Sequence, residues 1–312
     1  MDRRKAVIIL ALGCSLFGFL GVCSRYFYVQ GLNSFEVSFV RQGLATAGLF
    51  VLILLTNRKA LRIGREDILF VVAFGVLRLL SDASLFYSQN YSPLALSSLL
   101  QMTFPYYVLI LSLFIFHERI TAKKLIAIFI AFLGCVLMTG GLVDSEDESV
   151  RGVLSALFSG LCFGLYLIGN SVYVGKGKDP SAYVFYCFLV SSVVCLPFVD
   201  LGKTVTAMWS LEGIEYTLTF SLALTLLPMS LLAWSAKFIE ATTVSVVTMV
   251  KIVTAAIAGY MFYQEALSPV NIFGMGLLMI SVVILNVRVK KEADELEKTL
   301  NADGSDQMES KT

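Results

Sequence analysis

Four charged residues lie inside long apolar stretches of this sequence, where charges are otherwise rare: Arg41, Arg78, Asp82 and Lys251. A charge at the centre of a membrane helix costs about 2.5–3.5 kcal/mol on insertion scales, so such residues mark functional sites or buried pairs. Guanidinium groups hold carboxylates and phosphates with two parallel hydrogen bonds, and an ammonium adds a point charge. These residue types predict a site for a carboxylated or otherwise anionic or zwitterionic small molecule.

Sequence spacing places some of these charged residues on the same face of a helix. Arg78 and Asp82 are four apart, which places them on one face of a helix, where they can pair directly. A buried structural ion pair is therefore the alternative explanation for these two. Lys251 has no obvious local partner, and it shares a helix face with Thr248, which aligns with Gln101 in the internal repeat described below. The sequence predicts a cationic, hydrogen-bonding patch made from these five residues.

Aromatic and amide residues could add shape to the same site. Tyr166, Asn170 and Tyr173 follow the i, i+4, i+7 spacing of one helix face. Tyr107 and Trp234 could face the same space and stack on a flat or amphipathic solute. Plain packing and interfacial anchoring are the alternative explanations for membrane aromatics.

These residues must be positioned by membrane helices. The chain is 57% hydrophobic and 15% charged, with mean hydropathy +0.79, whereas soluble domains are about 25% charged. A spanning helix needs about 20 apolar residues. Ten such runs are present, which predicts an all-α integral membrane protein with ten transmembrane helices: 6–28, 34–56, 68–90, 93–116, 121–142, 151–174, 180–199, 216–238, 242–264 and 268–288.

The distribution of Lys and Arg predicts the orientation. With a cytoplasmic N-terminus, the cytoplasmic loops collect most of the basic residues, and the opposite side receives only Arg151 and Lys203 beside an acidic loop. Both termini are therefore expected in the cytoplasm, with a polar cytoplasmic tail over 289–312. The protein is expected to be a multi-pass protein of the cell (plasma) membrane.

The two halves of the chain are related by an internal repeat. Residues 91–138 align with 238–285 at a constant shift of 147, which places Glu118 on Glu265. Each half contains five predicted spans, an odd number, so the second copy must enter the membrane from the opposite side. The sequence predicts two inverted five-helix repeats, 1–142 and 149–288, a plan typical of secondary transporters that hold substrate between the halves.

A second set of residues is predicted to be structural or to act in gating. Glu118 and Glu265 precede turns at the membrane edge, and they are expected to fix those turns rather than touch substrate. A proline inside a membrane helix lacks a hydrogen-bond donor and can kink the helix. Arg25 flanks the first outer turn, where snorkelling and gate closure explain it equally well. The full set is Arg25, Arg41, Pro105, Glu118, Pro228 and Glu265.

At these motifs the chain resembles the EamA type of the drug/metabolite transporter superfamily. The resemblance rests on the glutamate-turn-helix elements, on Pro105 in Leu100-Gln-Met-Thr-Phe-Pro105 and on Arg41 in Ser38-Phe-Val-Arg41, and it covers residues 6–288. It implies a ten-helix bundle whose central cavity is lined chiefly by spans 1, 3, 4, 6, 8 and 9. It also implies a structural or gating role for Arg41. Ile252 replaces the proline usual in the ninth span, so no proline hinge is expected there.

Composition bounds the partners. A net charge of +1 argues against nucleic acid, which proteins usually meet with a strong basic excess. The single histidine and the absence of CxxC spacing argue against a metal site, so no cofactor is predicted. The expected partners are a small-molecule substrate and the lipid bilayer, with the protein a monomer or homodimer.

The leading interpretation is a secondary-active or facilitative transporter of a small metabolite, such as an amino acid or organic acid, working by alternating access. Asp82 is the only deep carboxylate, so proton coupling would have to run through it. An integral-membrane receptor or scaffold without flux is an alternative. A membrane-embedded enzyme is disfavoured, because such chemistry needs clustered acids, histidines or a metal.

Overall fold

A computed structural model of the chain describes residues 3–56, 58–61, 63–116, 126, 129–130, 132–134, 137, 147–235, 247–265, 268–270, 272–281 and 284. Helices dominate this part of the chain, and it contains no strand. Most of the predicted fifth span, 121–142, and the whole predicted tail, 289–312, lie outside the described residues.

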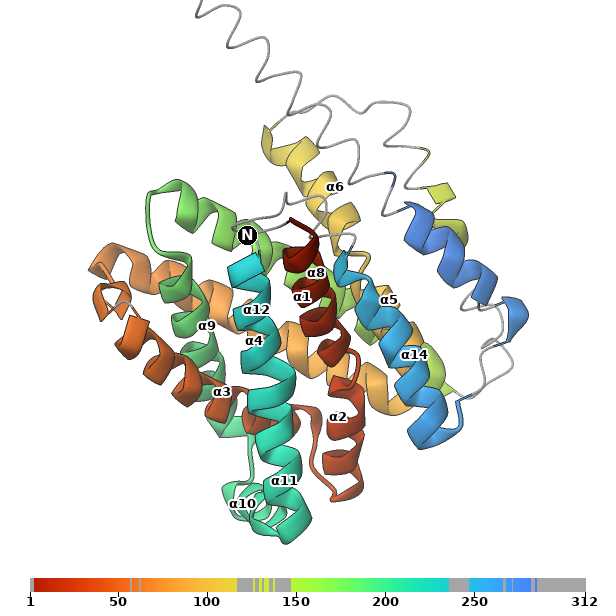
Figure 1. The fold of residues 1–312 in the computed structure, drawn as a ribbon, viewed down its shortest axis with the longest axis horizontal. Helices are drawn as coiled ribbons and strands as arrows, with labels where there is room; N and C mark the ends of the chain where they lie inside the picture. Colours follow the sequence, from red (N-terminus) through yellow and green to blue (C-terminus); the bar gives the residue numbers. More distant parts are fainter. Residues whose placement is uncertain are drawn as a thin grey trace, which may run out of the picture.

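The first half consists of helices joined by short turns, arranged side by side in Figure 1. Their bounds are α1 Arg3–Phe17, α2 Leu20–Val29, α3 Ser34–Thr56, the 3₁₀ turn η1 Arg58–Leu61, α4 Arg65–Tyr91, α5 Leu94–Gln101 and α6 Phe104–Phe116. The predicted first and fourth spans are therefore each divided into two helices.

The second half has one long connection, between α9 and α11, and one irregular span. Its elements are α8 Asp147–Gly175, α9 Pro180–Cys195, the 3₁₀ turn η2 Leu196–Phe198, α10 Leu201–Trp209, α11 Leu211–Leu218, the π-helical η3 Thr219–Leu226, α12 Leu227–Ser235 and α14 Val250–Tyr263. The α10 helix falls between the predicted seventh and eighth spans, in a stretch expected to be a loop.

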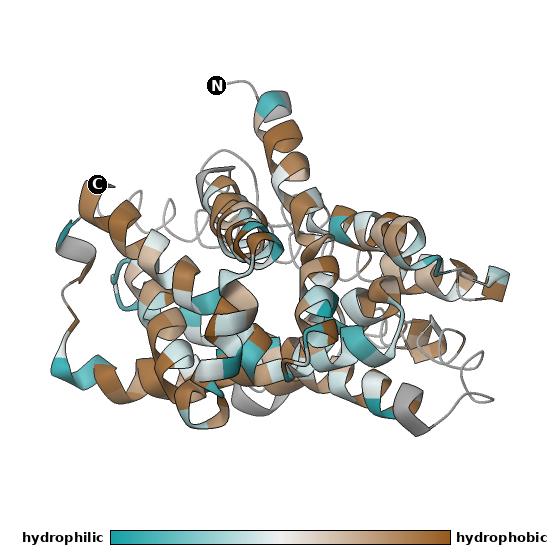
Figure 2. Cartoon of the chain, turned by 90° about the horizontal axis from the view of Figure 1, so that it is seen from below, coloured by the Kyte–Doolittle hydropathy of each residue, from teal (hydrophilic) through white to brown (hydrophobic). Residues whose placement is uncertain are grey.

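Six helical stretches of the described chain are long and apolar enough to cross a membrane: Lys5–Val29, Ser34–Thr56, Arg65–Tyr91, Val150–Gly175, Pro180–Phe198 and Leu211–Leu232. They correspond to the predicted spans 1, 2, 3, 6, 7 and 8. Shorter apolar helices, Val250–Tyr263 and Ile272–Ser281, lie within the predicted ninth and tenth spans. In Figure 2 hydrophobic residues cover most helical surfaces, and several hydrophilic segments lie towards the middle of the bundle.

Helix α4 passes through the middle of the bundle, packing on α3, α8 and α9 (Figure 1). Glycines permit this close approach. A Cβ atom at Gly75 would lie 2.7 Å from the Val190 side chain on α9, and one at Gly160 on α8 would lie 2.9 Å from the carbonyl oxygen of Gln101. Small residues let membrane helices pack backbone to backbone. As a result, the polar side chains of α4 and α5 face those of α8 directly.

The fourth span is broken where a proline requires it. A turn at Met102 and Thr103 separates α5 from α6, and Pro105 has no N–H to give to the carbonyl of Gln101. Thr103 satisfies the carbonyl of Leu100 through both its backbone N, at 3.1 Å, and its Oγ1, at 2.7 Å. The break therefore leaves Gln101 at the end of a short helix, with its side chain free to reach α8.

The ninth span is also interrupted, although it has no proline. The turn falls at Met249, which is 147 residues after Met102, and Ile252 N donates to the Met249 carbonyl at 2.9 Å. Ile252 itself is fully buried in an apolar cluster with Met102. This half therefore has a break in its ninth span without the proline that is usual there. Packing between the two breaks maintains the second one without a missing donor.

Candidate functional site

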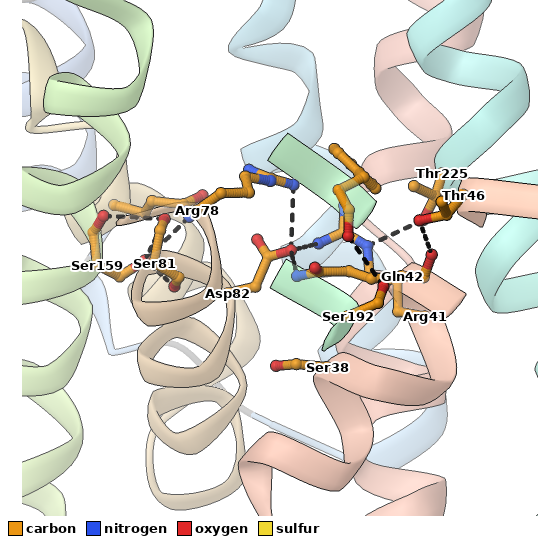
Figure 3. A network of polar contacts seen from close by, with 12 residues as sticks. Ser38, Arg41, Gln42, Thr46, Arg78, Ser81, Asp82, Ser159, Ser192 and Thr225 are labelled. Atoms are coloured by element: carbon orange, nitrogen blue, oxygen red, sulfur yellow. Dashed lines mark hydrogen bonds and ion pairs between the residues drawn. The ribbon is translucent and has the colours of Figure 1, made fainter. Parts of the chain in front are cut away.

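Asp82 is the centre of a buried polar network between α3 and α4 (Figure 3). Three donors converge on its Oδ2 atom: Arg41 Nη1 at 2.8 Å, Gln42 Nε2 at 2.9 Å and Arg78 Nη2 at 3.1 Å. Arg41, Arg78 and Asp82 are only 3%, 5% and 1% exposed, respectively. One carboxylate therefore faces two guanidinium groups in a region shielded from solvent.

The local sequence explains how α3 and α4 supply this network. Arg78 and Asp82 are one turn apart on α4, as predicted, and Arg41 and Gln42 are adjacent on α3. The sequence analysis gave Arg41 a structural or gating role and paired Asp82 with Arg78 alone. The structure confirms the contact between Arg78 and Asp82 and adds Arg41 to the same carboxylate oxygen, at the shorter distance.

The irregular eighth span completes the coordination of Arg41. Arg41 Nε donates to Thr225 Oγ1 at 2.9 Å, and Thr225 Oγ1 donates in turn to the Phe220 carbonyl at 2.7 Å. Thr225 belongs to η3 and lies three residues before the buried Pro228. Prolines and π-helical turns are recurrent causes of helix distortion, and π-turns are frequent at functional sites. The π-helical turn therefore places the Thr225 hydroxyl of the second half against Arg41 of the first half.

Arg78 lies among aromatic rings. Its Cζ atom is 5.0 Å from the ring centre of Phe188, 5.4 Å from Tyr166 and 5.8 Å from Phe163. Aromatic faces attract guanidinium groups without neutralising them. Tyr166, predicted to line the site, is therefore at its wall.

A second chain of polar contacts links α4, α5, α8 and α14. Ser81 and Ser159 exchange hydrogen bonds, each hydroxyl donating to the other residue's carbonyl, at 3.1 and 2.7 Å. Gln101 Nε2 donates to Ser159 Oγ at 3.0 Å, and Lys251 Nζ donates to Gln101 Oε1 at 3.1 Å. Lys251 makes no ion pair within the described part of the chain. Its ammonium is therefore solvated by a neutral amide, beside a network that already contains two guanidinium groups.

Several polar atoms near this network are buried without a hydrogen-bond partner among the described residues. They include Arg78 Nε and Gln42 Oε1, which belong to residues that contact Asp82. Most buried polar groups in proteins are satisfied, so each exception needs an explanation.

A different cluster occupies the end of the bundle where α2, α4 and α14 meet. Arg25 Nη1 lies 2.5 Å from Glu265 Oε1, and Arg25 Nη2 donates to the Ser92 carbonyl at 2.8 Å. Glu265 Oε2 accepts from the backbone N of Leu94 at 2.9 Å, and the Arg25 guanidinium lies over the Tyr263 ring. These residues line an open hollow of about 430 Å³. We call Arg25, Glu265 and their partners the rim cluster.

The remaining predicted residues are more scattered. Tyr107 on α6 and Thr248 are half-buried, and each has an interaction partner. Pro105 and Pro228 lie beside the helix irregularities described above. Trp234 is in α12, but its side chain is outside the described part of the structure, as is the whole of Glu118.

Sequence reasoning missed four residues of the network: Gln42, Ser81, Ser159 and Thr225. Gln42 gave a usable signal, since it is an amide next to Arg41 inside an apolar span. The hydroxyl residues gave none, because serine and threonine are common in membrane helices and usually bond to their own helix backbone. The described residues contain no cluster of histidine, cysteine, aspartate or glutamate suited to a metal ion.

Comparisons with known proteins agree with this architecture. The model of the EamA-like transporter family matches twice, over residues 4–140 and 150–287. An S-adenosylmethionine uptake transporter of Rickettsia prowazekii is 25% identical over 274 residues, covering 86% of this chain and 88% of the relative. A pseudopaline exporter of Pseudomonas aeruginosa is 26% identical over 265 residues, covering 83% of this chain and 88% of the relative.

The fold also occurs among solved structures. A crystal structure of a protein matches with TM-score 0.63 at 13% identity, covering 93% of this chain and 99% of the other. At this identity the likeness concerns the fold alone. The family matches, the named relatives and the spanning helices together show that the chain belongs to the EamA-like transporter family, as a multi-pass protein of the cell membrane.

Proposed function

We propose that the protein carries a small carboxylated solute, either an anion or a zwitterion such as an amino acid, by alternating access through the centre of the bundle. The solute's carboxylate binds beside Arg78, with Arg41 and Lys251 supplying further positive charge. The two halves of the chain, 1–142 and 149–288, act as inverted repeats. Ten spans then place both termini and the tail, 289–312, in the cytoplasm.

The single observation that carries this proposal is the unbalanced charge of the buried network. Arg41 and Arg78 share one carboxylate, Asp82, and the half-buried Lys251 contacts the neutral amide of Gln101, so the described residues of the network carry two positive charges in excess. Charges taken out of water are costly unless they are paired and hydrogen-bonded. A structural ion pair would need one arginine for Asp82, and the second arginine and the lysine would only add cost. A bound carboxylate or phosphate removes part of this imbalance.

The geometry also favours a solute with apolar or aromatic parts next to its charge. Three rings surround the Arg78 guanidinium. Neutral donors and acceptors of Gln101 and Ser159 join Lys251 to Ser81, which is adjacent to Asp82 on α4. S-adenosylmethionine, the solute named for one relative, joins an amino-acid carboxylate and ammonium to an aromatic base through a sulfonium. Its carboxylate and its base match the site, whereas its sulfonium must lie away from the arginines.

The rim cluster supports a closing role at one end of this route. Arg25 and Glu265 join α2 and α4 of the first half to α14 of the second. Opening that end requires their separation. Asp82 is fully engaged by the two arginines, so a coupling proton would act by releasing them.

Relatives named as transporters favour a carrier over a membrane-embedded enzyme. Two measurements distinguish a carrier from the alternative, a receptor or scaffold without flux. Counterflow in proteoliposomes with amino acids, organic acids and sugar phosphates tests for flux. Solute-dependent thermal stabilisation without counterflow would favour a receptor.

Charge-removing variants test the site. Loss of a buried charged contact costs about 3 kcal/mol, so Arg78→Gln and Lys251→Gln should each lower the apparent affinity for a carboxylated solute by roughly a hundredfold. Arg151→Gln is the matched control, because Arg151 is exposed on α8. Unchanged uptake in both buried variants would show that the site is elsewhere.

A further inference from the structure

Helix α10 presents three distinct faces. Thr204 is fully buried against the bundle, with Ala207 and Met208 partly buried beside it. A second face carries Leu201, Val205 and Trp209, one turn apart each, which are 51%, 47% and 74% exposed. The third face is polar: Gly202, Lys203 and Thr206. One face of α10 therefore packs on the protein, the second is apolar and exposed, and the third is exposed and carries the polar residues.

The bundle fixes α10 in place through polar contacts at its start. Asp200 caps the helix, its Oδ1 accepting from Lys203 N at 3.1 Å, and its own N donates to Glu36 Oε1 at 3.0 Å. Lys203 Nζ also donates to the Gly31 carbonyl at the α2–α3 turn. In Figure 1 α10 is seen nearly end-on beneath α11, so it lies across the end of the bundle rather than along it. The exposed apolar face is therefore held in a set direction.

That face continues into the apolar surface of the neighbouring spans. Phe198, at the end of the seventh span, is 57% exposed, and Leu211 and Ile214, at the start of the eighth, are 91% and 40% exposed. These residues end two stretches long enough to cross a membrane. Helix α10 therefore connects the ends of two candidate membrane spans, both of which carry exposed apolar side chains next to it in the sequence.

We propose that α10 is an interfacial helix, lying at the boundary of headgroups and acyl chains in the bilayer leaflet on this side. Leu201 and Val205 enter the acyl region, Trp209 lies at headgroup level, and Lys203 and Thr206 face water. An amphipathic helix in the plane of the interface buries its apolar face at this boundary, and tryptophan is enriched there. The occupant of the exposed face is lipid, because α10 connects the ends of two stretches that are long and apolar enough to cross a membrane.

This placement has a link to the buried network. Ser210 follows α10 directly and caps α11, its Oγ accepting from Gly213 N at 3.0 Å. The α11 helix leads into η3, which carries Thr225 and its contact with Arg41. An interfacial α10 therefore fixes the depth at which the eighth span presents Thr225.

The two tryptophans of the chain, Trp209 and Trp234, allow a direct test. The full-length Trp234→Phe protein is placed in bilayers whose phospholipids carry bromine near the headgroup end of the acyl chain, or near the chain terminus. We expect headgroup-proximal bromine to remove more than half of the Trp209 emission, and terminal bromine or aqueous iodide to remove much less. Should Trp234→Phe fail to fold, the difference between wild type and Trp209→Phe gives the same signal.

Paired variants in the Trp234→Phe background sharpen the result. Val205→Asp, on the apolar face, should lower quenching by brominated lipid at least twofold and shift Trp209 emission to longer wavelength. Thr206→Asp, equally exposed on the polar face, should change neither. Strong iodide quenching together with weak bromine quenching would overturn the proposal. Emission shielded from both quenchers would also overturn it, since it would mean that protein, including a second copy, covers this face.

Discussion

The buried network and the rim cluster are both built around arginine and one carboxylate, yet they differ in balance. At the rim, Arg25 meets Glu265, and backbone groups of Ser92 and Leu94 satisfy the remaining atoms. In the centre, Asp82 is shared by Arg41 and Arg78. Both clusters contain buried polar atoms without a partner among the described residues, such as Ser92 Oγ at the rim and Arg78 Nε in the centre. The difference is charge balance: one arginine meets one carboxylate at the rim, whereas two arginines share one carboxylate in the centre. The proposed roles, closing at the rim and solute binding in the centre, depend on this difference.

The largest expected effect comes from removing the central carboxylate. Asp82→Asn leaves two guanidinium groups buried without a counter-charge, which should lower the free energy of unfolding by about 3–5 kcal/mol. Thermal unfolding in detergent or lipid measures this. If proton-driven transport by this variant is unchanged, coupling does not run through Asp82.

The double variant Arg78→Met, Asp82→Asn sharpens the comparison. Relative to Asp82→Asn, it removes one of the two guanidinium groups that lack a counter-charge. Most of the stability lost in Asp82→Asn should therefore return. If the central charges serve only the fold, transport should return as well. Recovery of stability without recovery of counterflow is the outcome expected of a binding site.

A smaller effect is expected at the junction between the two halves. Thr225→Val keeps the side-chain shape but leaves Arg41 Nε without its acceptor, which should cost about 1.5–3 kcal/mol. Thr206→Val is the matched control, because Thr206 is exposed and bonds only to its own helix, Oγ1 to the Gly202 carbonyl. Equal stability of the two variants would mean that the contact with Arg41 contributes nothing.

At the rim, Glu265→Gln should cost about 1 kcal/mol or less, because the pair is partly exposed and Arg25 retains its carbonyl partners. We expect the maximal rate of counterflow to change while the apparent affinity for solute stays constant. A change in affinity comparable to that of Arg78→Gln would remove the distinction between the two clusters.

The smallest effect is expected at the opposite end of the bundle. Lys178 donates to Asp67, and this hydrogen bond raises the pKa of the lysine above its usual value. A raised pKa means that the contribution is complete below the lysine's unfolded pKa and is lost only at more alkaline pH. Between pH 6 and about 9, Lys178→Gln should therefore give a small, pH-independent shift in thermal unfolding.

Sequence alone was sufficient for features that depend on local spacing. Apolar length predicted a helical membrane protein, the motifs around Glu265 and Pro105 indicated the family, and the i, i+4 spacing predicted the contact between Arg78 and Asp82. The family and the membrane location are confirmed. The roles assigned to the site residues stay predictions.

Features that depend on contacts between helices far apart in the sequence could not be predicted from the sequence. Arg41 reaches Asp82 across 41 positions and Thr225 across 184, and no periodicity encodes either contact. The break at Met249 has no proline from which it could have been predicted. Helix α10 is too short and too mixed in composition to be predicted as a helix. Tertiary packing decides all three.

The interruption shared by the fourth and ninth spans has a mechanical consequence. A straight helix resists bending because each change of angle strains its ladder of peptide hydrogen bonds. Here the ladder is already open at Met102 and Met249, next to the cationic side chains. In the proposed alternating-access cycle, the segments above and below these joints swing separately, so that one end of the bundle widens while the opposite end stays shut.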